Sequence, residues 1–247
     1  MGKRILQRRR GKGGSQFRIS AKGKIAPVRY PNLRTETEEK LIVKAILDER
    51  GRTAPLAQLE HGTGDISYVP AVSGLAVGSS ISLGPNAAPS IGNILPLGRI
   101  PEGTRISNIE LRAGDGGKLV RASGGSAILF SKGNGRAILR LPSGKSILVD
   151  DRCRASIGEI AGGGRLEKPF LRAGPRHHAM KAQGRMYPRM RGIAMAVVYH
   201  PFGGGRHQHP GKSTSTSRNA PPGRKVGLIA PRKTGRKRLA RTSTEVK

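Results

Sequence analysis

The sequence predicts an all-β protein in which two small barrels lie between long basic extensions. Short apolar runs separated by Gly- and Pro-rich turns recur through the middle of the chain, a pattern typical of small barrels. Lys and Arg are concentrated at both ends, where apolar residues are scarce. Aromatic residues make up only 3% of the 247 residues and Trp is absent, so we expect small cores of Ile, Leu and Val.

The net charge of +31 is distributed unevenly along the chain. Residues 1–34 hold 11 Lys and Arg and no acid, and residues 176–247 hold 17 Lys and Arg and one acid. The 18 bases and 14 acids between them leave a charge of only +4. Because so large an excess repels itself unless a polyanion supplies counter-charge, we expect a nearly neutral centre and two arms that become ordered when a partner neutralises them.

The first half of the centre is expected to form four strands, each an apolar run that ends in a turn cluster. They cover residues 41–47, 54–59, 66–69 and 79–83. The Gly- and Pro-rich stretch 84–89 follows them and is the natural break between two barrels.

The second half is expected to form five more strands, at residues 104–112, 118–122, 127–130, 137–141 and 146–149. Gly133-Asn134-Gly135 predicts a hairpin, since Asn and Gly adopt left-handed backbone geometry easily, and Pro142-Ser143-Gly144-Lys145 predicts a second tight turn. No helical pattern of useful length is found, apart from a short amphipathic turn around residues 166–172.

These patterns predict a basic N-terminal arm at 1–34, a first barrel at 35–85, a second barrel at 86–175, and a Gly-, Arg- and His-rich basic arm at 176–247. No apolar run approaches the ~20 residues of a membrane-spanning helix, and the first 14 residues lack the apolar region of a secretory signal. The single Cys153 cannot form an internal disulfide, which favours a reducing intracellular compartment.

Several motifs suggest chemistry, and each has a simpler interpretation. Five of the six His lie between His177 and His209, but Cys153 is the only Cys, and contact with phosphate or 2′-hydroxyl explains these residues better than a zinc site. Gly211-Lys212-Ser213 looks like the end of a phosphate-binding loop, yet Arg206 stands where that pattern requires Gly. The arms nearly lack carboxylates that could orient a catalytic histidine. We therefore predict no catalytic residue, no metal site and no cofactor, and a small, partly buried Cys153.

The most informative segment is 191–206, in which an apolar run and His-Pro-Phe precede three glycines. Gly203, Gly204 and Gly205 allow positive φ angles and close approach to another backbone. A mere flexible linker would not need the apolar run, so we expect Arg191, Arg206, His200 and the glycine amides to converge on RNA phosphates.

Residues 200–209 resemble the glycine-rich signature of the family of the second universal protein of the large ribosomal subunit, in its archaeal and eukaryotic form. Ungapped matches to that family span essentially the whole chain: Gly92-Asn93, Leu95-Pro96-Leu97, residues 100–104, 114–119, 139–144, Cys153-Arg154-Ala155 and residues 217–223.

The resemblance implies an OB-like barrel followed by an SH3-like barrel, with extended ends threaded into large-subunit ribosomal RNA. It implies a structural protein of the cytoplasmic ribosome that supports the peptidyl-transferase region and the joining of the subunits. His200 matches a histidine proposed to aid peptide-bond formation. The family usually has Asn and Asp where this chain has Ala196 and Tyr199, which puts in doubt any carboxylate-oriented mechanism and suggests that Tyr199 stacks on an RNA base.

We expect the RNA contacts to come mainly from the two arms. The predicted residues are Lys3, Arg4, Arg8, Arg9, Arg10, Lys12 and Arg18 in the N-terminal arm; Lys118 and Arg154 in the centre; and Arg176, His177, His178, Lys181, Arg185, Arg189, Arg191, Tyr199, His200, Gly203, Gly204, Gly205, Arg206, His207, His209, Lys212, Arg218, Asn219, Arg224, Lys225, Arg232, Lys233, Arg236, Lys237 and Arg238 in the C-terminal arm.

The expected partners are large-subunit rRNA and neighbouring ribosomal proteins, with a contact to the small subunit also allowed and no membrane partner. Mg²⁺ or K⁺ is expected only as an ion that bridges the protein to RNA. Two other functions share part of the pattern. A DNA-compacting protein would share the charge but gives no reason for a neutral two-barrel centre, and an enzyme acting on RNA would require turnover by the purified protein that is lost when His200 is replaced.

Overall fold

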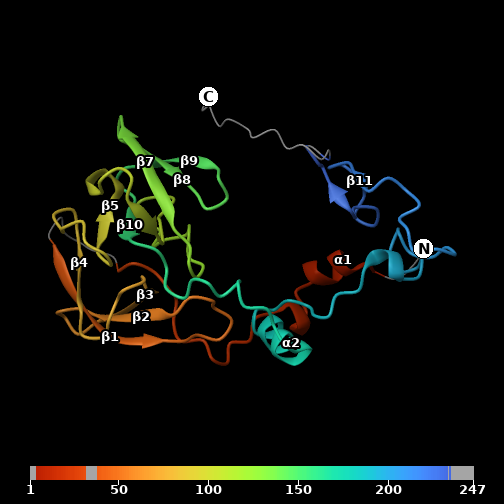
Figure 1. Ribbon diagram of the computed structural model, residues 1–247, viewed down its shortest axis with the longest axis horizontal. Helices are drawn as coiled ribbons and strands as arrows, with labels where there is room; N and C mark the ends of the chain where they lie inside the picture. Colours follow the sequence, from red (N-terminus) through yellow and green to blue (C-terminus); the bar gives the residue numbers. More distant parts are fainter. Residues whose placement is uncertain (1–3, 32–37, 233, 235–247) are drawn as a thin grey trace. The chain divides into compact units, whose positions relative to one another are not determined.

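The computed structural model describes residues 4–31, 38–232 and 234, and its fold is all-β, as predicted (Figure 1). The chain divides into two compact units. The first, Ala21–Leu171, is called the β unit here. The second, called the terminal unit, combines the described residues up to Ser20 with those from Arg172 onward. None of the described helices is long and apolar enough to span a bilayer.

The β unit contains a ten-stranded sheet with the order β3-β2-β1-β4-β5-β10-β6-β7-β8-β9. Its first half consists of β1 (Glu39–Leu47), β2 (Leu56–Glu60), β3 (Ile66–Pro70) and β4 (Ser80–Leu83). Strand β1 pairs antiparallel with both β2 and β4 (Figure 1). Alternation along β1 buries Leu41 and Val43 and exposes Ile42 and Lys44, so one face of the strand supplies the first core.

The second half consists of β5 (Ile94–Pro96), β6 (Arg105–Ser107), β7 (Ala127–Gly133), β8 (Arg136–Arg140), β9 (Ser146–Asp150) and β10 (Arg154–Ile157). A 3-10 turn, η2 (Leu97–Arg99), follows β5. A separate cluster of buried residues fills this half, with Ile106, Leu129 and Leu139 fully enclosed. The halves join where β4 pairs in parallel with β5 through Leu83 and Ile94. The two cores therefore have the small aliphatic composition that the sequence predicted.

Both predicted turns of the second half are confirmed. Asn134 and Gly135 connect β7 to β8 with φ of 53° and 70°, the left-handed geometry of a two-residue hairpin loop. The amide of Gly144 donates to the carbonyl of Leu141, which closes the turn between β8 and β9.

Some of the strand predictions were wrong. Strand β6 covers only three residues of the predicted 104–112, and the predicted strand 118–122 is reduced to a bridge between Ile109 and Leu119. Asn108 and Val120 take φ of 47° and 52°, which interrupts an extended backbone at both places. Strands β5 and β10 were not predicted at all. The segment limits predicted at 34, 85 and 175 stay predictions.

The terminal unit contains α1 (Leu6–Gly11), η1 (Ser15–Phe17), α2 (Ala173–Ala182), η3 (Gly192–Ala194), and the short parallel pair β11 (Ser215–Thr216) and β12 (Leu228–Ile229). The expectation of a helical turn at 166–172 was wrong, because the real helix begins at Ala173. Pro175 is accepted there, since amides of a first helical turn have no intrahelical partner. Helix α2 ends before Gly184, whose φ of 64° is the left-handed geometry common after a helix.

Candidate nucleic-acid interface

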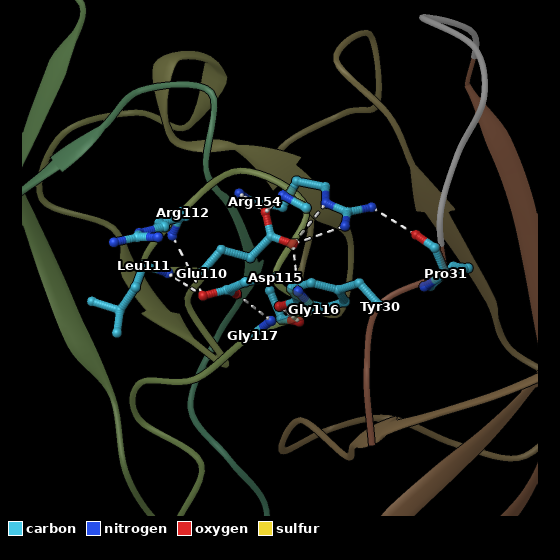
Figure 2. Close-up of polar contacts among 11 residues, drawn as sticks. Tyr30, Pro31, Glu110, Leu111, Arg112, Asp115, Gly116, Gly117 and Arg154 are labelled. Atoms are coloured by element: carbon cyan, nitrogen blue, oxygen red, sulfur yellow. Dashed lines mark hydrogen bonds and ion pairs between the residues drawn. The ribbon is translucent and has the colours of Figure 1, made fainter. Parts of the chain in front are cut away.

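A buried ion pair lies in the second half of the β unit, and its arginine also donates a hydrogen bond to the segment that precedes β1 (Figure 2). The carboxylate of Glu110 is fully buried, and the guanidinium Nη2 of Arg154 lies 2.8 Å from its Oε1. Glu110 also accepts hydrogen bonds from the backbone amides of Gly114, Gly116 and Arg154. The negative charge of Glu110 is thus paired with Arg154, and both carboxylate oxygens accept hydrogen bonds, as a buried carboxylate requires.

The other face of Arg154 reaches toward the N-terminal segment. Its Nη1 donates to the carbonyl of Pro31 at 2.8 Å, and its guanidinium carbon lies 5.4 Å from the centre of the Tyr30 ring. The hydroxyls of Tyr30 and Ser156 share a 2.8 Å hydrogen bond, and burial raises the pKa of the Tyr30 phenol. Arg154 was predicted to contact RNA, but its guanidinium is occupied within the β unit; Lys118, the other central candidate, is exposed.

The terminal unit has an extreme charge. Its described residues include six Lys and Arg up to Ser20 and twelve from Arg172 onward, eighteen in all, and no Asp or Glu. Every ion pair found among the described residues lies in the β unit. The cations of the terminal unit therefore have no carboxylate partner among the residues of that unit that the structure describes.

The two helices display these cations in groups. Helix α1 carries Arg8, Arg9 and Arg10 in its last turn, where the helix dipole favours positive charge, and all three are exposed. Helix α2 exposes Arg176, His177, His178 and Lys181. The guanidinium of Arg176 also lies 5.1 Å from the centre of the Tyr187 ring.

The glycine-rich segment forms a tight hydrogen-bonded loop from Met195 to Gly204. The amide of Gly204 donates to the Met195 carbonyl and that of Gly203 donates to the His200 carbonyl, both at 2.9 Å. A Cβ on Gly203 would come closer than 3.0 Å to the carbonyl oxygens of Met195 and Ala196. Gly204 and Gly205 have the predicted positive φ, at 79° and 87°, whereas the φ of Gly203 is not positive. The two amides expected to meet phosphate at 203 and 204 instead close this loop.

His200 is held by its neighbours in this loop. Its Nδ1 accepts a 3.1 Å hydrogen bond from the Phe202 amide, so the hydrogen of the neutral ring resides on Nε2. The ring packs on Gly192 so closely that a Cβ there would overlap it. Burial lowers the pKa of His200, which keeps the ring neutral. No carboxylate of the terminal unit's described residues can orient it for proton transfer.

A pocket of about 360 Å³ lies between helix α1 and the segment that leads into this loop. Its lining residues are Leu6, Arg9, Met186, Pro188, Arg189, Met190, Met195, Tyr199 and His200. Three of the five methionines of the chain are in this wall. The sequence prediction included the Arg, Tyr and His residues of this wall but missed Leu6, Pro188 and the three methionines. The close spacing of Met186, Met190 and Met195 was the signal that could have indicated the methionines.

The comparisons with known proteins agree on one family. A family model described as "Ribosomal Proteins L2, C-terminal domain" matches residues 90–225. Over 238 residues the chain is 50% identical to the large ribosomal subunit protein uL2 of Desulfurococcus amylolyticus, which covers 96% of this chain and 100% of that protein. The chain belongs to the uL2 family. The uL2 proteins of Korarchaeum cryptofilum and Cenarchaeum symbiosum are 49% and 48% identical to it, over 98% and 97% of the chain and 99% and 98% of those proteins.

Most residues predicted to contact RNA are at the surface of this uL2 protein. Arg154, His200, Gly203, Gly204 and Lys225 are partly buried, and the other predicted residues that the structure describes are exposed. Lys3, Lys233, Arg236, Lys237 and Arg238 lie outside the described residues. Within the described part of the chain, no cluster of three or more His, Cys, Asp or Glu could hold a metal ion.

Proposed function

We propose that this uL2 protein is a structural constituent of the large subunit of the cytoplasmic ribosome, where it binds and stabilises large-subunit rRNA. One observation carries the proposal: the terminal unit presents eighteen cations and no acid among its described residues. The positive charges of this surface are not neutralised by neighbouring carboxylates, so the surface fits a partner with regularly spaced negative charges. Membership of the uL2 family, whose relatives are named as large ribosomal subunit proteins, supports rRNA as that partner.

The two units have different tasks in this proposal. The β unit holds 21 Lys and Arg against 14 Asp and Glu, a net charge of only +7. It is compact, carries its own cores and ion pairs, and docks by shape on folded RNA. The terminal unit enters crevices between RNA helices, where its Arg and Lys replace condensed cations and its exposed His contact phosphate or 2′-hydroxyl groups. Mg²⁺ or K⁺ takes part only where it bridges the protein to RNA.

The proposal extends to the peptidyl-transferase region, to neighbouring ribosomal proteins and to a contact that supports subunit association. His200 has a positioning role in it rather than a catalytic one, because its Nδ1 is used by the Phe202 amide and the terminal unit's described residues include no carboxylate beside it. A His200→Gln variant should assemble and support peptide-bond formation. Intact assembly with loss of single-turnover peptide-bond formation would contradict the positioning role.

Sedimentation of cell extract through a sucrose gradient, before and after a high-salt wash, tests the assignment. The chain should migrate with the large subunit and remain there after the wash. A chain found free, or with chromosomal DNA, would instead support an architectural DNA-binding function.

A further inference from the structure

We propose that the pocket between helix α1 and the 186–200 segment is a binding site for one unstacked nucleobase of the bound RNA. This inference rests on the proposed function and adds to it a specific subsite and ligand class. The pocket, of about 360 Å³, falls in the lower part of the range of ~300–1,000 Å³ that is usual for small-molecule sites. That size suits a single nucleotide rather than a folded segment.

The walls of the pocket fit a flat, uncharged ring. Leu6, Met186, Pro188 and Met195 supply apolar surface, and methionine sulfur makes favourable contacts with aromatic rings. Tyr199 adds an aromatic ring on which a base can stack. Apolar surface of this kind has little to offer a phosphate or a hydrated cation.

Two arginines of the pocket can bind the phosphates of the nucleotide that carries this base. Arg9 and Arg189 line the pocket and are both exposed, so their guanidinium groups can reach a backbone that passes outside it. The described part of the terminal unit has no carboxylate to repel the phosphates. An apolar side chain of a partner protein would fill the walls equally well but would leave both arginines unpaired.

His200 gives the pocket one polar group of defined character. Because Nδ1 accepts the Phe202 amide, the neutral ring has Nε2–H to donate, which matches the carbonyl oxygens and ring nitrogens of nucleobases. The contact of the ring with Gly192 fixes its position. The ring of His200 is held in one orientation, but the described part of the terminal unit contains no acid that could make it a catalyst. Recognition of a base gives this fixed orientation a function.

The test compares two RNA ligands of equal length and phosphate number, an oligouridylate and a stable abasic analogue. The full-length protein is labelled with ¹³C at the methionine methyl groups. Met186, Met190 and Met195 report on the pocket, whereas Met180 lies on α2 outside its lining and serves as an internal control. Fluorescence anisotropy measures the affinity of both ligands in the same samples.

Both ligands should bind with a similar salt dependence, and the oligouridylate should bind roughly 5- to 150-fold more tightly, the range expected for stacking of one base. It should shift the three pocket methyl resonances and leave Met180 unchanged, whereas the abasic analogue should shift none of them. Arg9→Gln should weaken oligouridylate binding more than Arg10→Gln, although each removes one exposed charge from α1.

Equal affinities with no shift of the pocket methyl groups would overturn the nucleobase site and leave electrostatic RNA binding intact. Equal effects of Arg9→Gln and Arg10→Gln on oligouridylate binding would also count against the site. Failure of both ligands to bind would instead contradict the proposed function.

Discussion

Replacing Arg154 with Met should destabilise the β unit by about 3–5 kcal/mol, the cost of removing one partner of a buried ion pair. The substitution keeps an unbranched apolar side chain and removes the guanidinium. Glu110, fully buried, would then keep its negative charge with only backbone amides as donors.

The contacts of the pair give the same magnitude independently. Arg154 donates two side-chain hydrogen bonds to Glu110, from Nε at 3.2 Å and from Nη2 at 2.8 Å. Hydrogen bonds to charged groups contribute about 1.5–3 kcal/mol each, so the loss of two of them amounts to about 3–6 kcal/mol. The hydrogen bond to Pro31 and the contact with the Tyr30 ring are lost as well, which loosens the segment before β1.

Urea unfolding followed by far-UV circular dichroism measures this change, since the chain has no Trp to report by fluorescence. Lys118→Met is the matched control, because it removes an exposed charge from the same unit and should change stability by less than about 0.5 kcal/mol. The same two variants separate the two roles considered for Arg154. Unchanged stability of Arg154→Met, together with a smaller salt dependence of RNA binding, would show that Arg154 contacts RNA and would refute the structural role.

Three further predictions concern single residues. The pKa of His200 should lie below the ordinary 6.5 because the ring is partly buried, so the loop should lose stability as the pH falls below 6.5. NMR titration of the ring measures this pKa, and a value at or above 6.5 would contradict the prediction. Cys153 is fully buried and has a pKa of about 11 against the usual 9.0, so near pH 8 its thiolate fraction is about 100-fold smaller than that of an exposed cysteine. Its reaction with a disulfide reagent should therefore be at least about 100-fold slower in the folded protein than after unfolding in urea. Gly203→Ala should displace the Met195 carbonyl and shift the Met195 methyl resonance, whereas Gly223→Ala, which has open space for a Cβ, should leave it unchanged; equal spectra of the two variants would contradict the tight loop.

The strands were predictable where an apolar run is long or a turn motif is specific. In β1 the run from Leu41 to Leu47 is interrupted only by Lys44, and the Asn134-Gly135 loop specifies its hairpin locally. Strand β10 has only four residues, Arg154 to Ile157, and it pairs with β5 and β6, which lie about sixty and about fifty residues earlier in the chain. Such short strands carry too little local pattern, and tertiary pairing determines them.

The site was predictable in its charge and not in its geometry. Composition alone places most of the cations in the two terminal segments, because so many charged side chains cannot all be buried. Two features of the site depend instead on contacts between distant segments. The pairing of Arg154 with Glu110 and the pocket that joins Leu6 to Met186 form only when the chain folds, and neither spacing nor composition encodes them. Helix α2 was missed for a different reason, since Gly174 and Pro175 in its first turn resemble a loop.

Equilibrium binding of the full-length protein to large-subunit rRNA as a function of salt concentration tests the central claim most directly. If the terminal unit engages about 6–10 phosphates, the logarithm of the association constant should fall with the logarithm of salt concentration with a slope of about −5 to −9. Affinity should then drop about 10³- to 10⁵-fold between roughly 50 and 200 mM salt. A flat salt response, or equal affinity for duplex DNA under competition, would contradict the account.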